Sequence, residues 1–137
     1  MKTLKLLTVA AVLGTTILSA PSCGKYEEGP GFTLLTKKMR ITNEWDLKET
    51  VSPNGTVTTD SESDEYTIIE KDGTAKAVDG SITNTGSWEF SSNKEKLRTT
   101  FTYFGVSVTT EFTILRLTNK ELWLRDEDNY IYKSEAR

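Results

Sequence analysis

The stretch YTIIEKDGTAKAVDGSITNTGSWEF, residues 66–90, decides the fold because two turn signals separate its runs of strand-forming residues. Asp72-Gly73 and Asp79-Gly80 are each typical of a tight β-hairpin turn, where glycine supplies the positive φ angle that the turn requires. From Ser81 to Phe90, polar residues alternate with mostly apolar or small ones. A period of two is typical of a half-buried strand. The stretch therefore predicts consecutive strands joined by two hairpins.

The same period of two extends over most of the chain on both sides of this stretch. Residues 39–51 are expected to form a strand whose apolar side chains share one face; these are Met39, Ile41, Trp45, Leu47 and Val51. Between residues 106 and 117, Phe112 and Ile114 share one parity but Leu117 takes the other, which predicts a β-bulge near Ile114. Runs beginning near residues 39, 65, 74, 81, 96, 106, 121 and 129 predict eight strands, and no long helix is expected.

These strands follow one another with mostly short connections, which predicts an all-β fold. An antiparallel up-and-down meander of this kind can close into a small eight-stranded barrel, and closure removes the exposed strand edges. The alternative is a two-sheet β-sandwich. We favour the barrel because no long crossover connection is expected. The interior of an eight-stranded barrel is just wide enough to be filled by side chains or to hold one small ligand.

The first 22 residues have the pattern of a bacterial export signal. Lys2 and Lys5 precede an apolar run that is too short to span a bilayer comfortably. The segment Leu18-Ser19-Ala20-Pro21-Ser22-Cys23 then resembles a lipobox, in which cleavage exposes the cysteine for acylation. Cys23 is the only cysteine in the chain, so it cannot form an intramolecular disulfide. We expect residues 1–22 to be a lipoprotein signal peptide and Cys23 to carry the lipid that anchors the protein to the membrane.

Residues 23–38 are expected to form a lipidated tether, because glycines and a proline fill their first half. The acidic pair Glu27-Glu28 resembles the surface-export signals of Bacteroidetes lipoproteins, and an ordinary solvated linker is the alternative. Residues 39–137 are expected to form one barrel domain. The expected location is the outer membrane, with the domain on its periplasmic face or on the cell surface.

Four short segments of the expected barrel resemble a known family. They are Thr42–Leu47, Lys71–Thr74, Thr85–Phe90 and Phe112–Leu124. Together they are similar to the lipocalin-like lipoproteins of Bacteroidetes, and the similarity covers nearly all of the chain after Cys23. One departure is Asn43, where lipocalins usually have a glycine two residues before the tryptophan. The resemblance implies a small antiparallel barrel that binds a hydrophobic or amphipathic molecule, and it implies no catalytic residue.

Large aromatic side chains are the candidate ligand-binding residues, since small-molecule pockets are mostly apolar and aromatic. The candidates are Trp45, Trp88, Phe90, Phe101, Tyr103, Phe112 and Trp123. The competing interpretation is that these rings simply fill the core and leave no cavity.

Composition argues against catalysis, metal binding and nucleic-acid binding. The chain has no histidine, so the most common general base and metal ligand is absent. The net charge of −3 becomes more negative once residues 1–22 are removed, which disfavours nucleic acid. Two acidic runs are the candidate calcium sites; they are Asp60, Glu62, Asp64 and Glu65, and Asp126, Glu127 and Asp128. The first run lacks the glycine and the distal glutamate of an EF-hand loop, and both runs are interpreted as solvated. We expect a protein that is not an enzyme and has no cofactor and no metal site.

Two functions of different class remain open. In the first, a lipid-anchored barrel binds a small hydrophobic ligand. In the second, a filled barrel presents its outer surface to another protein of the cell envelope. A cavity lined by the tryptophans favours the first function, whereas a filled interior with an exposed apolar patch favours the second.

Overall fold

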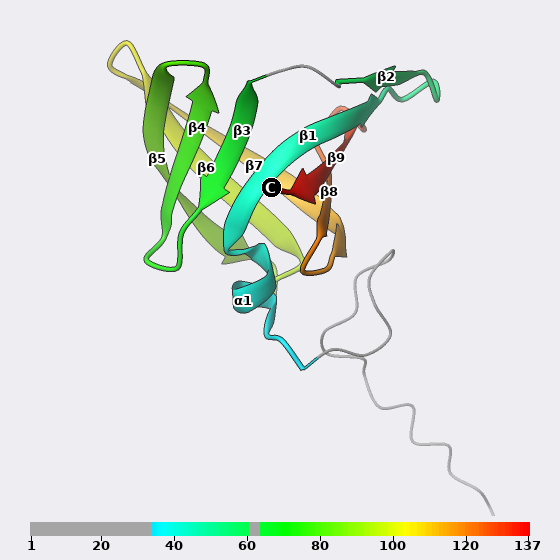
Figure 1. The fold of residues 1–137 in the computed structure, drawn as a ribbon, viewed down its shortest axis with the longest axis horizontal. Helices are drawn as coiled ribbons and strands as arrows, with labels where there is room; N and C mark the ends of the chain where they lie inside the picture. Colours follow the sequence, from blue (N-terminus) through cyan, green and yellow to red (C-terminus); the bar gives the residue numbers. More distant parts are fainter. Residues whose placement is uncertain (1–33, 61–63) are drawn as a thin grey trace, which may run out of the picture.

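The computed structural model describes residues 34–60 and 64–137. The predicted signal peptide, Cys23 and most of the predicted tether lie outside the described residues, so they stay predictions. The described residues form one short helix and nine strands (Figure 1). Their bounds are α1 (Lys37–Ile41), β1 (Asn43–Val51), β2 (Val57–Thr59), β3 (Glu65–Ile69), β4 (Thr74–Asp79), β5 (Ile82–Ser91), β6 (Lys96–Tyr103), β7 (Val106–Leu117), β8 (Glu121–Arg125) and β9 (Ile131–Ala136).

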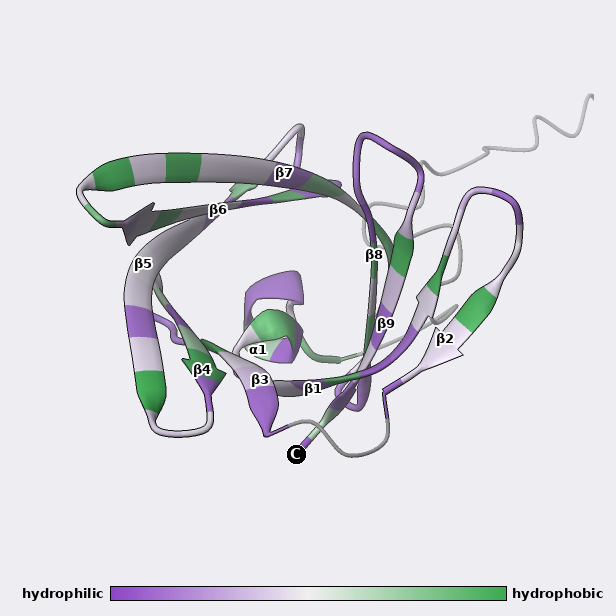
Figure 2. Cartoon of the chain, turned by 90° about the horizontal axis from the view of Figure 1, so that it is seen from above, coloured by the Kyte–Doolittle hydropathy of each residue, from purple (hydrophilic) through white to green (hydrophobic). Residues whose placement is uncertain are grey.

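The strands form one antiparallel sheet that closes on itself. From β3 to β9 each strand pairs with the next along the chain, and β1 pairs with both β3 and β9. The prediction of an eight-stranded up-and-down barrel is therefore confirmed, and the sandwich alternative is wrong because the β1–β9 pairing leaves no gap between two sheets. The ninth strand, β2, pairs with the C-terminal half of β1 and projects beside the barrel (Figure 2).

The segment that begins at Met39 is a helix and not the start of the first strand, so the prediction is wrong there. α1 spans Lys37–Ile41, and the Thr36 hydroxyl caps it by accepting a hydrogen bond from the Met39 backbone N–H at 3.1 Å. Threonine is a favourable N-cap because its side chain satisfies a backbone donor that the first turn leaves free. The helix lies across one end of the barrel, where Ile41 is fully buried (Figures 1 and 2). Burial against the barrel overrides the alternating pattern.

The predicted hairpins and bulge are confirmed. Gly73 and Gly80 lie in the β3–β4 and β4–β5 turns with φ angles of +94° and +55°, which glycine adopts without the penalty of a side chain. The register between β7 and β8 shifts between Ile114 and Arg116. Because of this shift, both Ile114 and Leu117 belong to the core although their positions differ in parity.

The core lies at the α1 end of the barrel. Its buried members are Ile41, Trp45, Ile69, Ala75, Trp88, Leu97, Ile114, Leu117 and Leu122. The buried Arg40 guanidinium donates a hydrogen bond from Nη1 to the Leu117 carbonyl at 2.5 Å, which connects α1 to the end of β7. Hydrophobic packing and this bond together close that end of the barrel.

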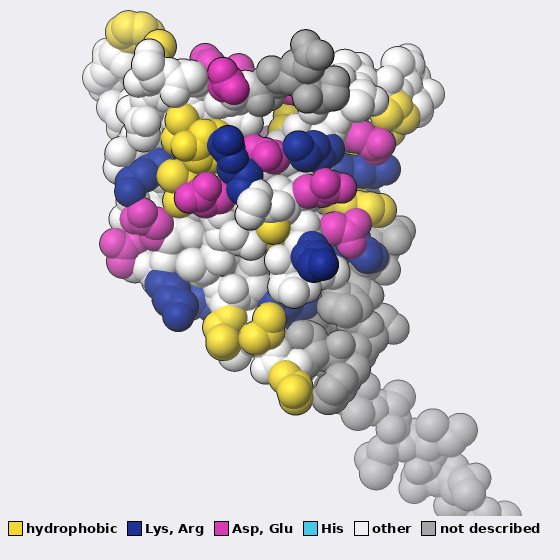
Figure 3. Space-filling view, in the orientation of Figure 1, with side chains coloured by type: hydrophobic (Ala, Val, Ile, Leu, Met, Phe, Trp, Pro, Cys, Tyr) yellow, Lys and Arg dark blue, Asp and Glu magenta, His cyan; other side chains and the backbone are white. Residues whose placement is uncertain are grey.

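The outer wall carries alternating charges. Figure 3 shows basic and acidic side chains interspersed around the middle of one face, with apolar side chains gathered at the upper hairpins and the lower end. On this wall, hydrogen bonds from Lys96, Ser91 and Arg98 lower the pKa of the Glu111 carboxyl to about 2. Three basic residues on strands form ion pairs with carboxylates that do not line the barrel interior; they are Lys76, Lys96 and Arg98.

Candidate functional site

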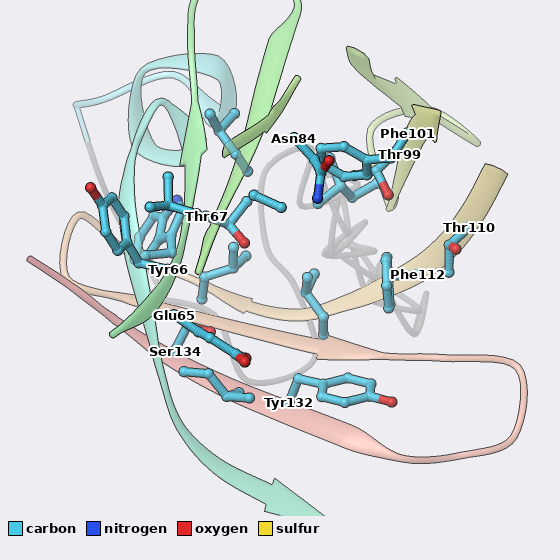
Figure 4. Close-up of a pocket in the computed structure, with 18 of the residues that line it drawn as sticks. Glu65, Tyr66, Thr67, Asn84, Thr99, Phe101, Thr110, Phe112, Tyr132 and Ser134 are labelled. Carbon is cyan, nitrogen blue, oxygen red and sulfur yellow. The ribbon is translucent and has the colours of Figure 1, made fainter. Parts of the chain in front are cut away.

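A cavity of about 520 Å³ occupies the barrel interior. Its residues come from every strand of the closed barrel, and none of them belongs to α1. Figure 4 shows Glu65, Thr99 and Phe112 among the side chains that surround this space. Since α1 covers the opposite end, the cavity has its mouth at the end where the β4–β5, β6–β7 and β8–β9 connections lie (Figures 1 and 2). Ligand pockets in proteins typically measure about 300–1,000 Å³, so this space has the size of a small-molecule site.

The floor of the cavity is apolar and well supported. Trp45 and Leu97 line it, and both are nearly fully buried. The Trp45 indole N–H donates to the Ile41 carbonyl at 2.9 Å, which holds the ring between α1 and the cavity. A buried tryptophan of this kind retains a hydrogen bond for its only polar atom. The floor is therefore a preformed apolar surface.

Aromatic rings form part of the wall above the floor. Phe112 and Tyr132 meet edge to face with ring centroids 6.1 Å apart, a geometry that aromatic pairs prefer. The Tyr132 hydroxyl donates to Oδ2 of Asp126 at 2.8 Å. Burial, together with this bond, raises the pKa of the Tyr132 phenol to about 12. The ring is thus held in place from the mouth side by Asp126.

Polar side chains also face the cavity. Hydroxyls and an amide are contributed by Thr67, Asn84, Thr99, Thr110 and Ser134, and carboxylates by Glu65, Asp79 and Asp126. The carboxylates lie at the mouth ends of β3 and β4 and just after β8. The cavity therefore changes from apolar at its floor to acidic at its mouth.

The structure divides the seven aromatic residues singled out in the sequence into three groups. Trp45, Phe101, Tyr103 and Phe112 line the cavity. Trp88 lies in the core, with Phe90 packed against it at 5.3 Å between ring centroids. Trp123 is not among the lining residues; it contacts Lys133 and Arg116 in cation–π arrangements at 4.7 and 5.3 Å.

Trp123 lies elsewhere because of the alternation on its own strand. Leu122 and Leu124 line the cavity, so the residue between them points out of the barrel. Trp88 and Phe90 do face inward, but they lie at the core end of β5, where the Trp88 indole N–H donates to the Glu70 carbonyl at 2.7 Å. The alternation along a strand predicts whether a ring points into or out of the barrel. The position of the ring along the barrel axis then decides whether an inward ring packs in the core or lines the cavity.

Several lining residues were missed in the sequence because they are polar or isolated. Thr99 lies between Leu97 and Phe101 at the same parity, and that spacing is the signal that places it on the inner face. Tyr132 is opposite Leu124 in the β8–β9 register, so it shares the inner face with that leucine.

The described residues of the two acidic runs lie at loops and strand ends near the mouth. The Asp126 carboxylate accepts hydrogen bonds from the Tyr130 backbone N–H and the Tyr132 hydroxyl, so part of its role is to shape the β8–β9 turn. Glu62 lies outside the described residues. Among the residues that are described, no three histidine, cysteine or acidic side chains gather as a metal ligand set.

Residues 34–60 and 64–137 contain no helix long and apolar enough to cross a membrane.

A closed eight-stranded antiparallel barrel with one covered end and an internal cavity defines a lipocalin-like fold. No protein-family model matches the chain, and no curated protein matches it either. Two solved structures are similar to it. One is a lipocalin-like protein from Bacteroides uniformis, with a TM-score of 0.59 and 17% identity over 72% of this chain and 99% of that one. The other is an uncharacterized protein from Bacteroides eggerthii, with a TM-score of 0.54 and 18% identity over 70% of this chain and 98% of that one.

These similarities confirm the predicted resemblance at the level of fold. The match covers nearly the whole of both neighbouring chains.

Proposed function

We propose that this protein is a lipid-anchored binding protein of the bacterial outer membrane that holds a small hydrophobic ligand inside its barrel. The observation that carries the proposal is the cavity of about 520 Å³ with its apolar floor. A space of this size and lining is typical of a small-molecule site. The absence of histidine from the sequence supports binding over catalysis.

The position of α1 supports a particular orientation on the membrane. The described chain enters the barrel through α1, at the end opposite the mouth (Figure 1). A lipid on Cys23 would be connected to the barrel at this covered end. The mouth would then face away from the anchoring membrane, toward ligands that arrive from the aqueous side.

Ligand binding is tested with a panel of fatty acids and retinoid-like probes, followed by tryptophan fluorescence and isothermal titration calorimetry. Trp45 is the reporter because it lines the floor, whereas Trp123 does not line the cavity. Binding of at least one apolar probe at one site per barrel is expected. No binding by any probe, together with no carried-over ligand in native mass spectra of the purified protein, would contradict the proposal.

A matched pair of variants tests whether the ligand binds inside the barrel. Thr110 lines the cavity, while its neighbour Thr109 is exposed and shares a hydroxyl contact of 2.9 Å with Thr100. Thr110→Phe adds a ring inside the cavity and is expected to weaken binding. Thr109→Phe adds the same ring outside and is expected to leave the affinity unchanged. Equal effects of the two substitutions would show that the probe binds elsewhere.

The anchor is tested separately by Cys23→Ala. In the native host this variant is expected to leave the membrane fraction, because several acyl chains anchor a protein far more stably than one or none. Retention of the variant in the membrane fraction would contradict lipidation at Cys23.

An exposed apolar hairpin favours the second candidate function, an interaction module of the cell envelope. At the β6–β7 turn Phe104 is fully exposed in a left-handed conformation with φ of +49°, and Val106 is 65% exposed. Exposed apolar clusters often mark interaction sites. If this hairpin docks on an envelope protein, Phe104→Ser should abolish cross-linking from that hairpin in cells and leave the affinity for apolar probes intact. Unchanged cross-linking would exclude this role for the hairpin.

A further inference from the structure

We propose that the ligand is amphipathic and cationic, with an apolar chain on the cavity floor and an ammonium group among the carboxylates of the mouth. This inference rests on the proposed function and names the chemical class of ligand. It is based on the distribution of charge around one cavity.

Two carboxylates face each other at the mouth. Glu65 and Asp79 are directly opposed in the β3–β4 register and both line the cavity. Like charges directly opposite each other destabilise a sheet. A cation between the two would turn this repulsion into attraction. Asp126 adds a third carboxylate from the far side of the mouth, where it already holds the Tyr132 hydroxyl.

No protein cation neutralises these carboxylates from within the cavity. Among the described residues that line it, none is lysine or arginine. The cations of the adjacent strands, such as Lys76 and Arg98, form ion pairs with carboxylates that do not line the cavity. Arg40 lies below the floor, where its guanidinium donates to the Leu117 carbonyl. The field inside the mouth is therefore that of unneutralised acids, which favours positive ligands.

A hydroxyl on the cavity wall is a second feature that suits a ligand with a polar group. Thr99 is only 9% exposed, and its side chain lies on the cavity lining (Figure 4). The Thr99 hydroxyl is not among the fully buried polar atoms of the described residues that lack a partner, so it is accessible from the cavity. This group is therefore placed to bind a polar atom of a ligand. It lies between the apolar floor and the acidic mouth.

Apolar side chains also border the mouth. The inner face of the flared β6–β7 hairpin continues the cavity wall with Tyr103 and Val106, which are directly opposed, and with Val108. Ile82 at the start of β5 is 60% exposed and opposes Asp79. The entrance therefore offers both acidic and apolar groups. An amphipathic molecule matches both kinds of group, whereas a purely apolar one leaves the carboxylates without a partner.

The proposal is tested with three probes of equal chain length: dodecylamine, dodecanol and dodecanoate. Binding is measured by calorimetry at low and high ionic strength, below the concentrations at which micelles form. The amine is expected to bind roughly tenfold more tightly than the alcohol at low salt, equivalent to about 1.4 kcal/mol, and the dodecanoate most weakly. Salt should reduce the preference because exposed charges are screened.

Two double variants separate local charge from net charge. Glu65→Gln with Asp79→Asn is expected to bring the amine and the alcohol within about twofold of each other, since the Coulomb term is removed. Glu44→Gln with Glu135→Gln removes two carboxylates that do not line the cavity and should leave the preference intact. The alcohol should bind all three proteins equally, which shows that the barrels are folded.

The outcomes distinguish this inference from the proposed function. Equal binding of the three probes, or tightest binding of dodecanoate, overturns the cationic ligand and leaves the apolar binding site standing. Binding of none of the probes removes the proposed function itself. Stoichiometric calcium binding that is lost in the Glu65→Gln, Asp79→Asn protein and that displaces the amine would identify the mouth as a metal site and also overturn the inference.

Discussion

Gly86→Ala tests how closely β5 and β6 approach each other in the barrel wall. A Cβ atom at Gly86 would lie 2.1 Å from the Thr100 carbonyl oxygen and 2.7 Å from Cδ1 of Phe101. The phenyl ring of Phe101, directly opposite in the register, therefore occupies the space that a side chain at Gly86 would need. The ring could shift, but the Thr100 carbonyl belongs to the paired strand and can move only if the two strands separate.

Two opposing effects decide how much Gly86→Ala changes the free energy of unfolding. Replacing glycine by alanine restricts the unfolded chain and by itself stabilises a protein by about 0.4–1 kcal/mol. Overpacking typically costs about 1–3 kcal/mol, and contact with backbone places this site at the upper end. We expect a net loss of roughly 2–3 kcal/mol in the free energy of unfolding. For a domain of this size that is a decrease of roughly 8–20 °C in Tm.

The measurement is urea and thermal unfolding of both proteins followed by circular dichroism, with Ser87→Ala as the control. Ser87 is the next residue on β5 and is exposed, so its substitution should change stability by less than about 0.5 kcal/mol. A Gly86→Ala protein that melts at or above the wild-type temperature would refute the close approach of the two strands.

Three further predictions concern the core and two titrating groups. Leu117→Ala should lower the free energy of unfolding in urea by about 2–5 kcal/mol because Leu117 is fully buried. Val106→Ala, at a 65% exposed position, should lower it by less than about 0.5 kcal/mol. Similar losses in the two variants would contradict the assigned core. The pKa of Glu111 is lowered to about 2 from its ordinary 4.5, so its stabilising effect is complete above pH 4.5 and is lost toward pH 2. The Tm difference between wild type and Glu111→Gln should shrink over that range, and a constant difference would argue against the ion-pair network. In an absorbance titration the tyrosine that ionises near pH 12 should be missing from Tyr132→Phe; its persistence would assign it to another residue.

Local sequence patterns were sufficient to predict most of the strands and turns of the barrel wall. The Asp-Gly turns, the alternation along 81–90 and the parity change near Ile114 each depend on residues close together in the chain, and the structure contains all three features. The same alternation places Trp45 and Phe101 on the inner face. It also places Trp123 outside, once Leu122 and Leu124 are recognised as the inner pair.

The helix and the extra strand depended on contacts that no local pattern contains. Met39 and Ile41 fit an alternating strand, but the Thr36 cap and the burial of Ile41 under the barrel stabilise a helix instead. β2 is three residues long and exposed throughout. It forms because the preceding turn returns the chain beside β1.

By itself the sequence determined an all-β chain of successive hairpins, because turn chemistry and alternation are local properties. The cavity was decided only by the tertiary structure, since the empty volume depends on how all inward side chains fill a closed barrel. The acidic mouth depends partly on the same closure. The β3–β4 hairpin brings Glu65 and Asp79 together, and only closure of the barrel brings Asp126 around the same opening.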